Sequence, residues 1–505
     1  MVENTKYEVI IGLEIHAELK TQTKMFCLCK NDPDEVKPNS NICEICTAQP
    51  GTLPVLNKKA IEHVIKVGLA CGSNIADFTE WDRKNYFYPD IPKGYQISQY
   101  KYPLVSSGSI KGVELTRIHL EEDTGSSTHD AGDFSLVNFN RAGVPLMELV
   151  TNPVIHSGKQ AAEFAKELQL LLQYLGVGDA NMEKGEMRVE ANISVQKAGL
   201  WTFKKGLGTD VFIYNGVIDG QAPTPEMSAK VEIKNLNSFR TVERAVAYEI
   251  ERQIDAIEKG EKVIQETRGW DEGKQKTFSQ RLKESSHDYR YFPDPDLPKM
   301  MISEVFDLNK LKSNLPELPW QRREKYLKVY EIKEQDAEMY VNDNLYGNFF
   351  ELVANKLNND KKAIHLASNY ISSDIAGIVK VSGIKFPAWL TRDKENSSGV
   401  FAKLIMMIIN NTISSRVAKD ILKTMYEKGG DPEEIANKEG LIQKNDEGAV
   451  KDIALKLIAE NPKVVADYKA GKEMALMFFV GQIMKATKGS SNPQVIKKVL
   501  VSLLS

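Results

Sequence analysis

The chain has 505 residues, a formal net charge of −3 and a pI near 6.3. This length predicts two to four domains, and the near-neutral charge excludes a globally basic nucleic-acid coat protein while leaving room for local basic patches. Hydrophobic residues make up 42% of the chain and charged residues 27%, as in ordinary globular proteins. No run approaches the ~20 apolar residues that span a bilayer, and the first residues lack the apolar core of a signal peptide, so we expect a cytoplasmic protein without membrane association.

The first predicted element is a strand over residues 9–18. Apolar residues occupy its odd positions, whereas Glu14, His16 and Glu18 share the even positions. Because successive side chains leave a strand on opposite sides, this alternation predicts one buried face and one polar face. Three later stretches alternate in the same way: residues 117–123, 187–194 and 231–235. If the four strands belong to one sheet, its polar face carries many carboxylates together with histidine, arginine and lysine.

Four of the five cysteines form two close pairs, Cys27 with Cys29 and Cys43 with Cys46. Five cysteines are too few for a disulfide scaffold, and two pairs separated by a loop can bring four thiolates to one tetrahedral Zn²⁺. Such a site has no open coordination position, so its expected role is structural. The alternative is a set of four reduced, partly buried thiols. Cys71 is predicted to be a core residue.

Two amphipathic helices are predicted at 157–176, capped by Ser157 and ended by Gly176, and at about 238–259. Prolines cluster near residue 298, and beyond them the sequence becomes charged and favourable to helices. We therefore predict a strand-rich domain at 1–298 with a zinc knuckle at 27–46, a helical domain at 299–405 and a helical tail at 406–505. A polar linker is expected at 392–399. Helices are expected in the last part of the chain at 401–409, 417–426, 449–459 and 471–488.

The polar faces of the four strands suit phosphoryl transfer. That reaction depends on positioning and on neutralising charge, usually by Mg²⁺ on carboxylates and by Lys or Arg on phosphate oxygens. The candidate metal ligands are Glu14, His16, Glu122, Glu190 and Glu232, and the candidate phosphate contacts are Arg188 and Lys234. Mg²⁺ usually needs only one or two protein carboxylates, so not all of these are ligands, and the imidazole suits Mn²⁺ or Zn²⁺ better. The alternative for any one strand is a solvent-exposed charged face.

The strand at 117–123 poses a choice between two neighbouring carboxylates. Strict alternation places Glu121 beside His119 and turns Glu122 to the opposite side. Glu122 reaches the polar face only if the strand ends or bulges there. On spacing alone, Glu121 is the better candidate.

Several motifs are missing from the sequence. It has no G-x-x-x-x-G-K-[ST] loop and no G-x-G-x-x-G after a strand, so a nucleotide site would be non-standard. It also has no G-x-S-x-G and no H-E-x-x-H, so serine-hydrolase and zincin chemistry lack support.

Three loops instead suit substrate binding. Residues 82–90 and 288–296 combine Arg, Tyr and Pro-Asp, which favours stacking on a base and contact with phosphate, and residues 123–129 are small and hydroxyl-rich, as in a phosphate cradle. The alternative for each loop is an ordinary surface turn. The residues expected to bind ATP or substrate are Arg83, Lys84, Tyr86, Arg188, Asn235 and Arg290.

Eight segments in chain order carry a family resemblance, and they cover residues 12–20, 82–90, 94–100, 119–125, 140–146, 232–239, 288–293 and 481–486. Together they resemble the GatB family, whose members belong to the tRNA-dependent amidotransferase complex GatCAB. The resemblance implies an α+β fold, with an antiparallel-sheet cradle domain that holds a kinase site. It also implies that an all-helical domain follows and that a helical tail domain contacts tRNA.

The resemblance further implies an ATP-dependent ligase. In this family the side-chain carboxylate of Glu-tRNA(Gln) or Asp-tRNA(Asn) is phosphorylated by ATP, and ammonia then displaces the phosphate to give Gln-tRNA(Gln) or Asn-tRNA(Asn). The implied partners are a glutaminase subunit, which supplies the ammonia, a small third subunit, which completes a heterotrimer, and the misacylated tRNA. The implied cofactors are Mg²⁺ (or Mn²⁺) and a structural Zn²⁺, with ATP as a substrate.

Carried onto this chain, the metal-holding positions of the family match His16, Glu122 and Glu232, which favours Glu122 over Glu121 against the alternation. Glu14, Glu121 and Glu190 lie near these positions, and Glu190 stands where the family usually has Asp. Lys234 and Arg188 are expected to contact phosphate from their face and charge alone. Residues 198–227 are longer than the usual connection, and the four-cysteine site occurs in only part of the family.

Two other functions remain open. A non-catalytic, zinc-stabilised RNA-binding protein would use its acidic face to bind a partner and would show no metal-dependent ATP turnover with tRNA. A metal hydrolase would act without ATP and without tRNA. The tail offers basic residues to tRNA phosphates, or to solvent as an ordinary helix face: Lys485, Lys488, Lys497 and Lys498.

Overall fold

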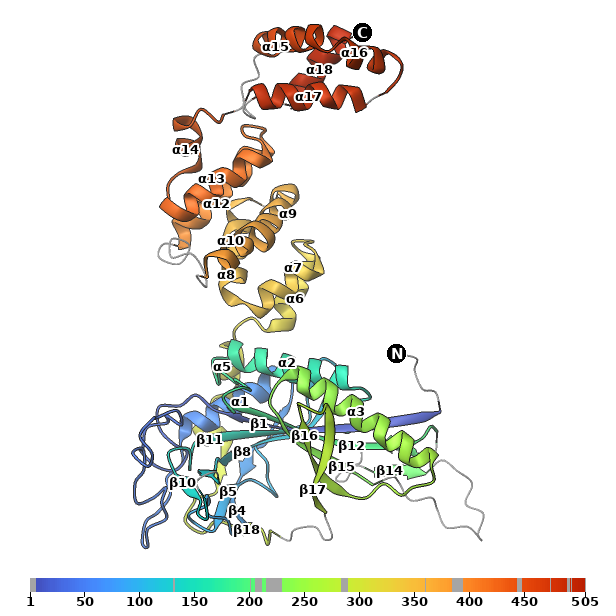
Figure 1. Ribbon diagram of the computed structural model, residues 1–505. Helices are drawn as coiled ribbons and strands as arrows, with labels where there is room; N and C mark the ends of the chain where they lie inside the picture. Colours follow the sequence, from blue (N-terminus) through green and yellow to red (C-terminus); the bar gives the residue numbers. More distant parts are fainter. Residues whose placement is uncertain are drawn as a thin grey trace. The chain divides into compact units, whose positions relative to one another are not determined.

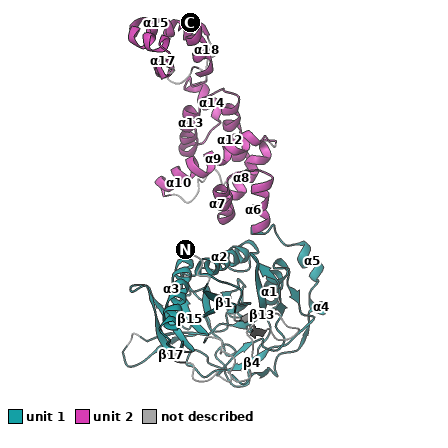
Figure 2. Ribbon diagram, turned by 90° about the vertical axis from the view of Figure 1, so that its right-hand side faces the viewer, with its two compact units in different colours: residues 1–319 teal, residues 320–505 magenta. Residues whose placement is uncertain are grey.

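The computed structural model describes residues 6–504 apart from 130–131, 200, 205–210, 215–228, 283–288, 359, 384–393, 443–446, 473, 488–490 and 492. The chain divides into two compact units, residues 1–319 and residues 320–505 (Figure 2). The division of the chain at residues 298 and 405 stays a prediction.

The first unit is built on a ten-stranded sheet with the order β17-β16-β15-β12-β1-β11-β8-β6-β2, and β7 pairs with β8. The strands are β1 (Tyr7–Glu18), β2 (Asn74–Ile75), β6 (Val105–Ser106), β7 (Ser109–Ile110), β8 (Val113–Glu122), β11 (Pro145–Thr151), β12 (Met187–Lys197), β15 (Val231–Leu236), β16 (Glu266–Asp271) and β17 (Lys276–Leu282). Neighbours are antiparallel except β15 and β16, which run parallel. The four alternating stretches, in β1, β8, β12 and β15, therefore lie in one sheet, as predicted.

Three helices cover one face of this sheet: α1 (Lys58–Ala70), α2 (Gly158–Tyr174) and α3 (Phe239–Glu258) (Figure 1). In β1, Leu13, Ile15 and Ala17 are buried, while Glu14 and His16 between them are half-buried. Burial of the apolar face against helices holds the layers together, so the alternating carboxylates are left on the other face. The structure thus confirms the mixed α+β class with a mainly antiparallel sheet.

The two predicted helices of the first unit begin at the predicted caps. The Ser157 hydroxyl accepts a hydrogen bond from the amide of Gln160, and the Ser238 hydroxyl accepts one from the amide of Thr241. A serine at this position satisfies one of the amides that the first helical turn leaves unpaired. Gly176 follows the first of these helices at a φ of +64°, a left-handed conformation that glycine adopts without a Cβ clash.

Smaller sheets bring distant loops together. The three-stranded sheet β18-β4-β5 consists of β18 (Phe292–Pro293), β4 (Asp82–Asn85) and β5 (Tyr95–Ser98), and it joins the 82–90 and 288–296 loops. Further pairs are β3 (Phe78–Thr79) with β19 (Met300–Met301), β9 (Ser126–Thr128) with β10 (Leu136–Asn138), and β13 (Trp201–Lys204) with β14 (Val211–Tyr214). The last pair lies in the 198–227 segment, most of which is outside the described residues. Short helices α4 (Ile302–Val305) and α5 (Leu308–Ser313) complete this unit.

The second unit is helical where it is described. Its elements are α6 (Pro319–Lys328), α7 (Glu334–Asn342), α8 (Asn344–Lys356), α9 (Lys361–Asn369), a π-helical turn (Tyr370–Ile375), α10 (Ala376–Ser382), α12 (Lys394–Ile409), α13 (Ser415–Lys428), α14 (Pro432–Lys438), α15 (Glu447–Glu460), α16 (Pro462–Lys469), α17 (Met474–Ala486) and α18 (Pro493–Leu504). The predicted helices of the last part of the chain correspond to α12, α13, α15 and α17. Helices α15, α17 and α18 share a core that includes Val450, Phe479 and Leu500.

The predicted linker at 392–399 is wrong from residue 394 onward, because these residues form the first turns of α12. Ser397 and Ser398 are buried, so this polar stretch packs against its surroundings and is not an exposed connection. Among the described residues, no helix has both the length and the apolar character that crossing a membrane requires.

Candidate active site and metal centres

Metal-type side chains from five adjacent strands, β15, β12, β1, β11 and β8, meet on the polar face of the large sheet. They form three groups, each with its ligand atoms within 4.8 Å of one another. Because Glu14 and Glu148 each belong to two groups, the three groups form one continuous row. We call this set the carboxylate row, and its members are Glu14, His16, His119, Glu121, Glu148, Glu190 and Glu232.

The strand register explains the carboxylate row. His16 lies opposite Glu148 across β1 and β11, and Glu148 lies opposite His119 across β11 and β8. Glu14 lies opposite Glu190 across β1 and β12. Residues directly opposite in an antiparallel pair have Cβ atoms about 4.5–5.5 Å apart, and like charges at that separation destabilise the sheet. The Glu14–Glu190 pair therefore opposes folding unless a cation lies beside it.

The two histidines supply part of that positive charge. His16 Nε2 lies 3.4 Å from Glu148 Oε2 and 3.6 Å from Glu121 Oε1, and His119 Nε2 lies 3.3 Å from Glu148 Oε2. Burial opposes a charge on His16, but the surrounding carboxylates, with Glu148 foremost, outweigh burial and raise the pKa of His16 to about 9. Burial likewise opposes the charge of Glu148, but the two imidazoles hold its pKa well below the ordinary value. Glu148 is thus an ionised carboxylate shared by two histidines.

Lys234 supplies positive charge at the β15 end of the row. Its Nζ donates to Glu190 Oε2 at 2.7 Å and lies 3.8 Å from Glu232 Oε1. Burial lowers the pKa of Lys234, but these two carboxylates outweigh burial and raise it. The Thr267 hydroxyl on β16 donates to Glu232 Oε2 at 2.8 Å, and both side chains are buried. The structure therefore brings together the predicted residues Glu190, Glu232 and Lys234.

Glu122, which was predicted to hold metal with His16 and Glu232, lies outside these groups in the described part of the chain. Its Oε2 accepts a hydrogen bond from Lys93 at 2.5 Å, and its Oε1 accepts one from the amide of Ile97 at 2.9 Å. The pairing of β8 with β11 continues without a register shift through Glu121 and Glu122, so no bulge turns Glu122 toward the polar face. The alternation, which favours Glu121, describes the arrangement correctly.

Sequence reasoning missed Glu148. Its strand, β11, has apolar residues at both odd and even positions and is buried almost throughout, so it shows no alternation. The available signal was a single carboxylate inside an apolar run, because Glu is almost never fully buried unless it is paired. Glu148 is 5% exposed.

Lys84 on β4 faces the carboxylate row from the three-stranded sheet. Burial lowers its pKa, but the Glu121 and Glu148 carboxylates outweigh burial and raise the pKa above its ordinary value. Its Nζ lies 5.0 Å from the ring centroid of Tyr289, which in turn lies 6.2 Å from the ring of Tyr86. Two of the predicted substrate residues, Lys84 and Tyr86, are therefore placed beside an aromatic cluster over the row.

Two predicted arginines are engaged in ion pairs that hold loops. Arg83 donates through Nε to Asp294 at 2.7 Å and through a terminal nitrogen to Asp296 at 2.9 Å. A terminal nitrogen of Arg188 donates to Asp123 Oδ2 at 2.9 Å. These contacts bind the 288–296 loop to β4 and the 123–129 loop to β12, so the geometry gives both guanidinium groups a structural role.

Asn235 and Arg290, also predicted to bind substrate, are exposed residues with left-handed backbone conformations at φ values of +62° and +45°. The carbonyl of Arg290 accepts a hydrogen bond from the Asn85 side chain at 2.8 Å. Positive φ is uncommon for residues other than glycine and often marks a turn or a functional constraint. The third loop joins the same region, since the amide of Gly125 donates to the carbonyl of Asp90 at 2.9 Å.

The residues of the polar face fit a divalent cation. Two buried atoms there, His119 Nδ1 and Asn192 Oδ1, have no hydrogen-bond partner among the described residues, and Asn192 lies opposite Glu232 in the strand register. Unsatisfied buried polar atoms are rare in proteins and point to water or an ion that completes the site. Carboxylate and amide oxygens suit Mg²⁺, and a set that includes imidazole also suits Mn²⁺.

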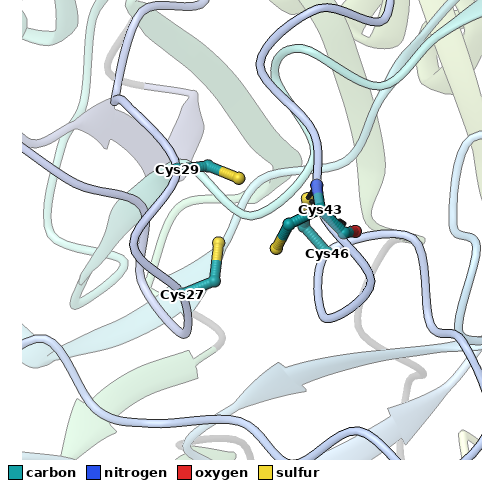
Figure 3. Close-up of side chains that lie close together, drawn as sticks. All are labelled: Cys27, Cys29, Cys43 and Cys46. Carbon is teal, nitrogen blue, oxygen red and sulfur yellow. Dashed lines mark hydrogen bonds between the residues drawn. The ribbon is translucent and has the colours of Figure 1, made fainter.

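The four cysteines converge as predicted, and their sulfur atoms all lie within 4.8 Å of one another (Figure 3). A tetrahedral Zn²⁺ with bonds of about 2.3 Å holds its four sulfurs about 3.8 Å apart, so the cluster fits a metal ion of this kind. The hydrogen bond from Cys27 lowers the pKa of Cys46 to about 5 despite partial burial, which favours a thiolate. Cys71 lies apart as a buried core residue, as predicted, and burial raises the pKa of Cys71 to about 12.

Comparison with known proteins matches both parts of the chain. Residues 9–306 match the GatB/GatE catalytic domain, and residues 348–504 match the GatB domain. The GatB-type subunit of an aspartyl/glutamyl-tRNA(Asn/Gln) amidotransferase from Caldicellulosiruptor saccharolyticus is 43% identical over 98% of each chain. Proteins of the same name from Thermoanaerobacter pseudethanolicus and Picosynechococcus are each 40% identical over at least 98% of either chain. These matches confirm the resemblance seen in the sequence motifs, and the chain belongs to the GatB family of tRNA-dependent amidotransferase subunits.

Proposed function

We propose that this chain is the ATP-dependent, amide-forming component of a heterotrimeric amidotransferase. It would transfer the γ-phosphoryl group of ATP to the side-chain carboxylate of Glu-tRNA(Gln), of Asp-tRNA(Asn) or of both, releasing ADP. Ammonia would then attack the acyl carbon, phosphate would leave, and Gln-tRNA(Gln) or Asn-tRNA(Asn) would form. A glutaminase partner would release the ammonia, and a small third partner would complete the complex, which we place in the cytoplasm.

The observation that carries this proposal is the carboxylate row, flanked by lysines at both ends. Bound Mg²⁺ or Mn²⁺ would neutralise the negative charge of the transferring phosphoryl group. We assign the ligands to the groups Glu14–Glu190–Glu232 and Glu14–His16–Glu148. Cations that face the metal site can hold the phosphate oxygens of ATP and neutralise charge in the transition state. We assign this role to Lys84 over the β8 end of the row and to Lys234 at the β15 end.

The four-cysteine cluster is proposed to hold a structural Zn²⁺. Four thiolates complete a tetrahedral coordination sphere, which leaves no position for water or substrate. The zinc would therefore stabilise the 27–46 knuckle and take no part in the phosphoryl transfer.

The tail is proposed to contact tRNA. Lys485 and Lys498 are exposed, although Lys498 Nζ also donates to Glu447 at 2.9 Å. Lys497 is half-buried, and Lys488 lies outside the described residues. Lysines that neutralise RNA phosphates make binding salt-dependent, so replacement of the exposed pair should weaken tRNA binding most clearly at low salt.

Amidation by the complex reconstituted with its glutaminase and small partners tests the proposal. Glu190→Gln should abolish the ATP-dependent conversion of Glu-tRNA(Gln) or Asp-tRNA(Asn), because it removes a charge from a proposed metal group. Glu163→Gln, a change on the exposed face of α2, is the control and should retain activity. Wild-type activity of Glu190→Gln with ATP would refute the metal assignment. ATP-independent activity, or no ATP turnover by an intact complex with tRNA, would instead support a hydrolase or a non-catalytic RNA-binding protein.

A further inference from the structure

Lys24 is a fully buried lysine beside the four-cysteine cluster. Its side chain is 0% exposed, and its Nζ lies 3.9 Å from Cys46 Sγ and 3.2 Å from the carbonyl oxygen of Phe139. No carboxylate of the described residues forms an ion pair with this ammonium group. The counter-charge nearest to it is therefore that of the cysteine sulfurs.

A buried ammonium group without a counter-charge is costly. Removing an ion from water costs several kcal/mol even after the protein relaxes, and lysine is almost never fully buried unless it is paired. One Zn²⁺ with four thiolates carries a formal net charge of −2, since two positive charges meet four negative ones. A fixed positive charge at 3.9 Å from one of these sulfurs would offset part of that excess.

We infer that Lys24 is the counter-cation of the four-cysteine zinc site and that it links this site to residues 139–143. The inference rests on the zinc assignment in the proposed function. Lys24 is a positioning residue here, because it touches the sulfur of a ligand and a backbone carbonyl and not the reacting atoms.

The link to residues 139–143 does not depend on Lys24 alone. The amide of Met25 donates to the carbonyl of Gly143 at 2.7 Å, and the amides of Ser40 and Asn41 donate to Asn140 Oδ1 at 2.9 Å and 3.0 Å. Strand β11, which carries Glu148, begins two residues after Gly143. The knuckle is thus joined to the entry of the strand that supplies the central carboxylate of the row.

Zinc retention by the full-length chain tests the inference. Lys24→Met removes the charge and keeps an unbranched apolar side chain, and Lys24→Gln removes the charge but keeps a donor for the Phe139 carbonyl. Lys30→Met is the matched control, because Lys30 adjoins Cys29 in sequence but is exposed and paired with Asp32. Zinc content is measured by elemental analysis, and the rate of zinc transfer to a colorimetric chelator is followed at neutral pH. Circular dichroism checks folding.

We expect both Lys24 variants to release zinc at least tenfold faster than the wild-type chain, and Lys30→Met to release it at the wild-type rate. If Lys24→Met does not fold, Lys24→Gln decides the question. Release from folded Lys24→Gln as slow as from the wild type would overturn the inference while leaving the zinc assignment intact. A folded wild-type chain that neither contains nor takes up zinc would overturn both.

Discussion

The Thr267 hydroxyl offers a specific test of the β15 end of the carboxylate row. It donates to Glu232 Oε2 at 2.8 Å, and Thr267 and Glu232 are 7% and 8% exposed. Valine has nearly the same shape as threonine but cannot donate a hydrogen bond. Thr267→Val therefore removes one contact that orients Glu232 and leaves the packing of β16 nearly unchanged.

The size of the effect follows from the burial of this contact. A hydrogen bond to a charged group contributes about 1.5–3 kcal/mol, and each 1.4 kcal/mol changes an equilibrium constant about tenfold. Loss of a partner that orients a metal ligand typically lowers metal affinity about 10–100-fold. We expect the Mg²⁺ concentration that gives half-maximal amidation to rise by about the same factor in Thr267→Val.

A titration of amidation by the reconstituted complex against Mg²⁺ measures this effect. Thr267→Ser should restore the wild-type Mg²⁺ requirement, because it keeps the hydroxyl. Thr277→Val is the control in the same hairpin, since the Thr277 hydroxyl bonds Glu249 and Arg268 and not Glu232. If Thr267→Val needs no more Mg²⁺ than the wild type, Glu232 does not hold the metal in the proposed way.

Three further predictions concern other groups of the first unit. Glu148→Gln should lower ATP-dependent amidation at least ~100-fold at saturating Mg²⁺, because it removes the charge that both histidines share; unchanged rates would show that β11 is not part of the site. In the chain stripped of divalent metal, the pKa of His16 is raised from 6.5 to about 9, although burial opposes its charge. Its stabilising contribution is therefore complete below pH 6.5 and lost as the pH rises through about 9, so the melting-temperature advantage of the wild type over His16→Gln should shrink over that range, and a constant difference would contradict the charge assignment. Cys71, with its pKa raised to about 12 by burial, should resist iodoacetamide in the native chain at pH 8, as peptide mass spectrometry will show; labelling as fast as in urea would contradict its burial.

The strands that carry most of the site were predictable because they separate a core from a polar face. In β1, the period of two places Glu14 and His16 opposite Leu13 and Ile15, and the observed burial follows that period. The helix starts at Ser157 and Ser238 were predictable for a similarly local reason, because a serine hydroxyl can satisfy an amide of the first turn.

Features that depend on more distant packing were not predictable in this way. Strand β11 is covered on both faces, so it lacks alternation and Glu148 escaped notice. Glu122 was favoured over Glu121 by the family motif, whereas the unbroken β8–β11 register places Glu121 in the carboxylate row. The pairing of Arg83 with Asp294 joins residues more than two hundred positions apart, and a single sequence does not reveal such a contact.

The central claim is that the carboxylate row phosphorylates an aminoacyl-tRNA carboxylate. ATP consumption by the reconstituted complex, measured with Glu-tRNA(Gln) and with Asp-tRNA(Asn), each with and without Mg²⁺, tests it most directly. We predict ADP formation that requires both Mg²⁺ and at least one of the two misacylated tRNAs, and that falls to background in Glu190→Gln. ADP formation that is independent of misacylated tRNA, or that persists in Glu190→Gln, would contradict this claim.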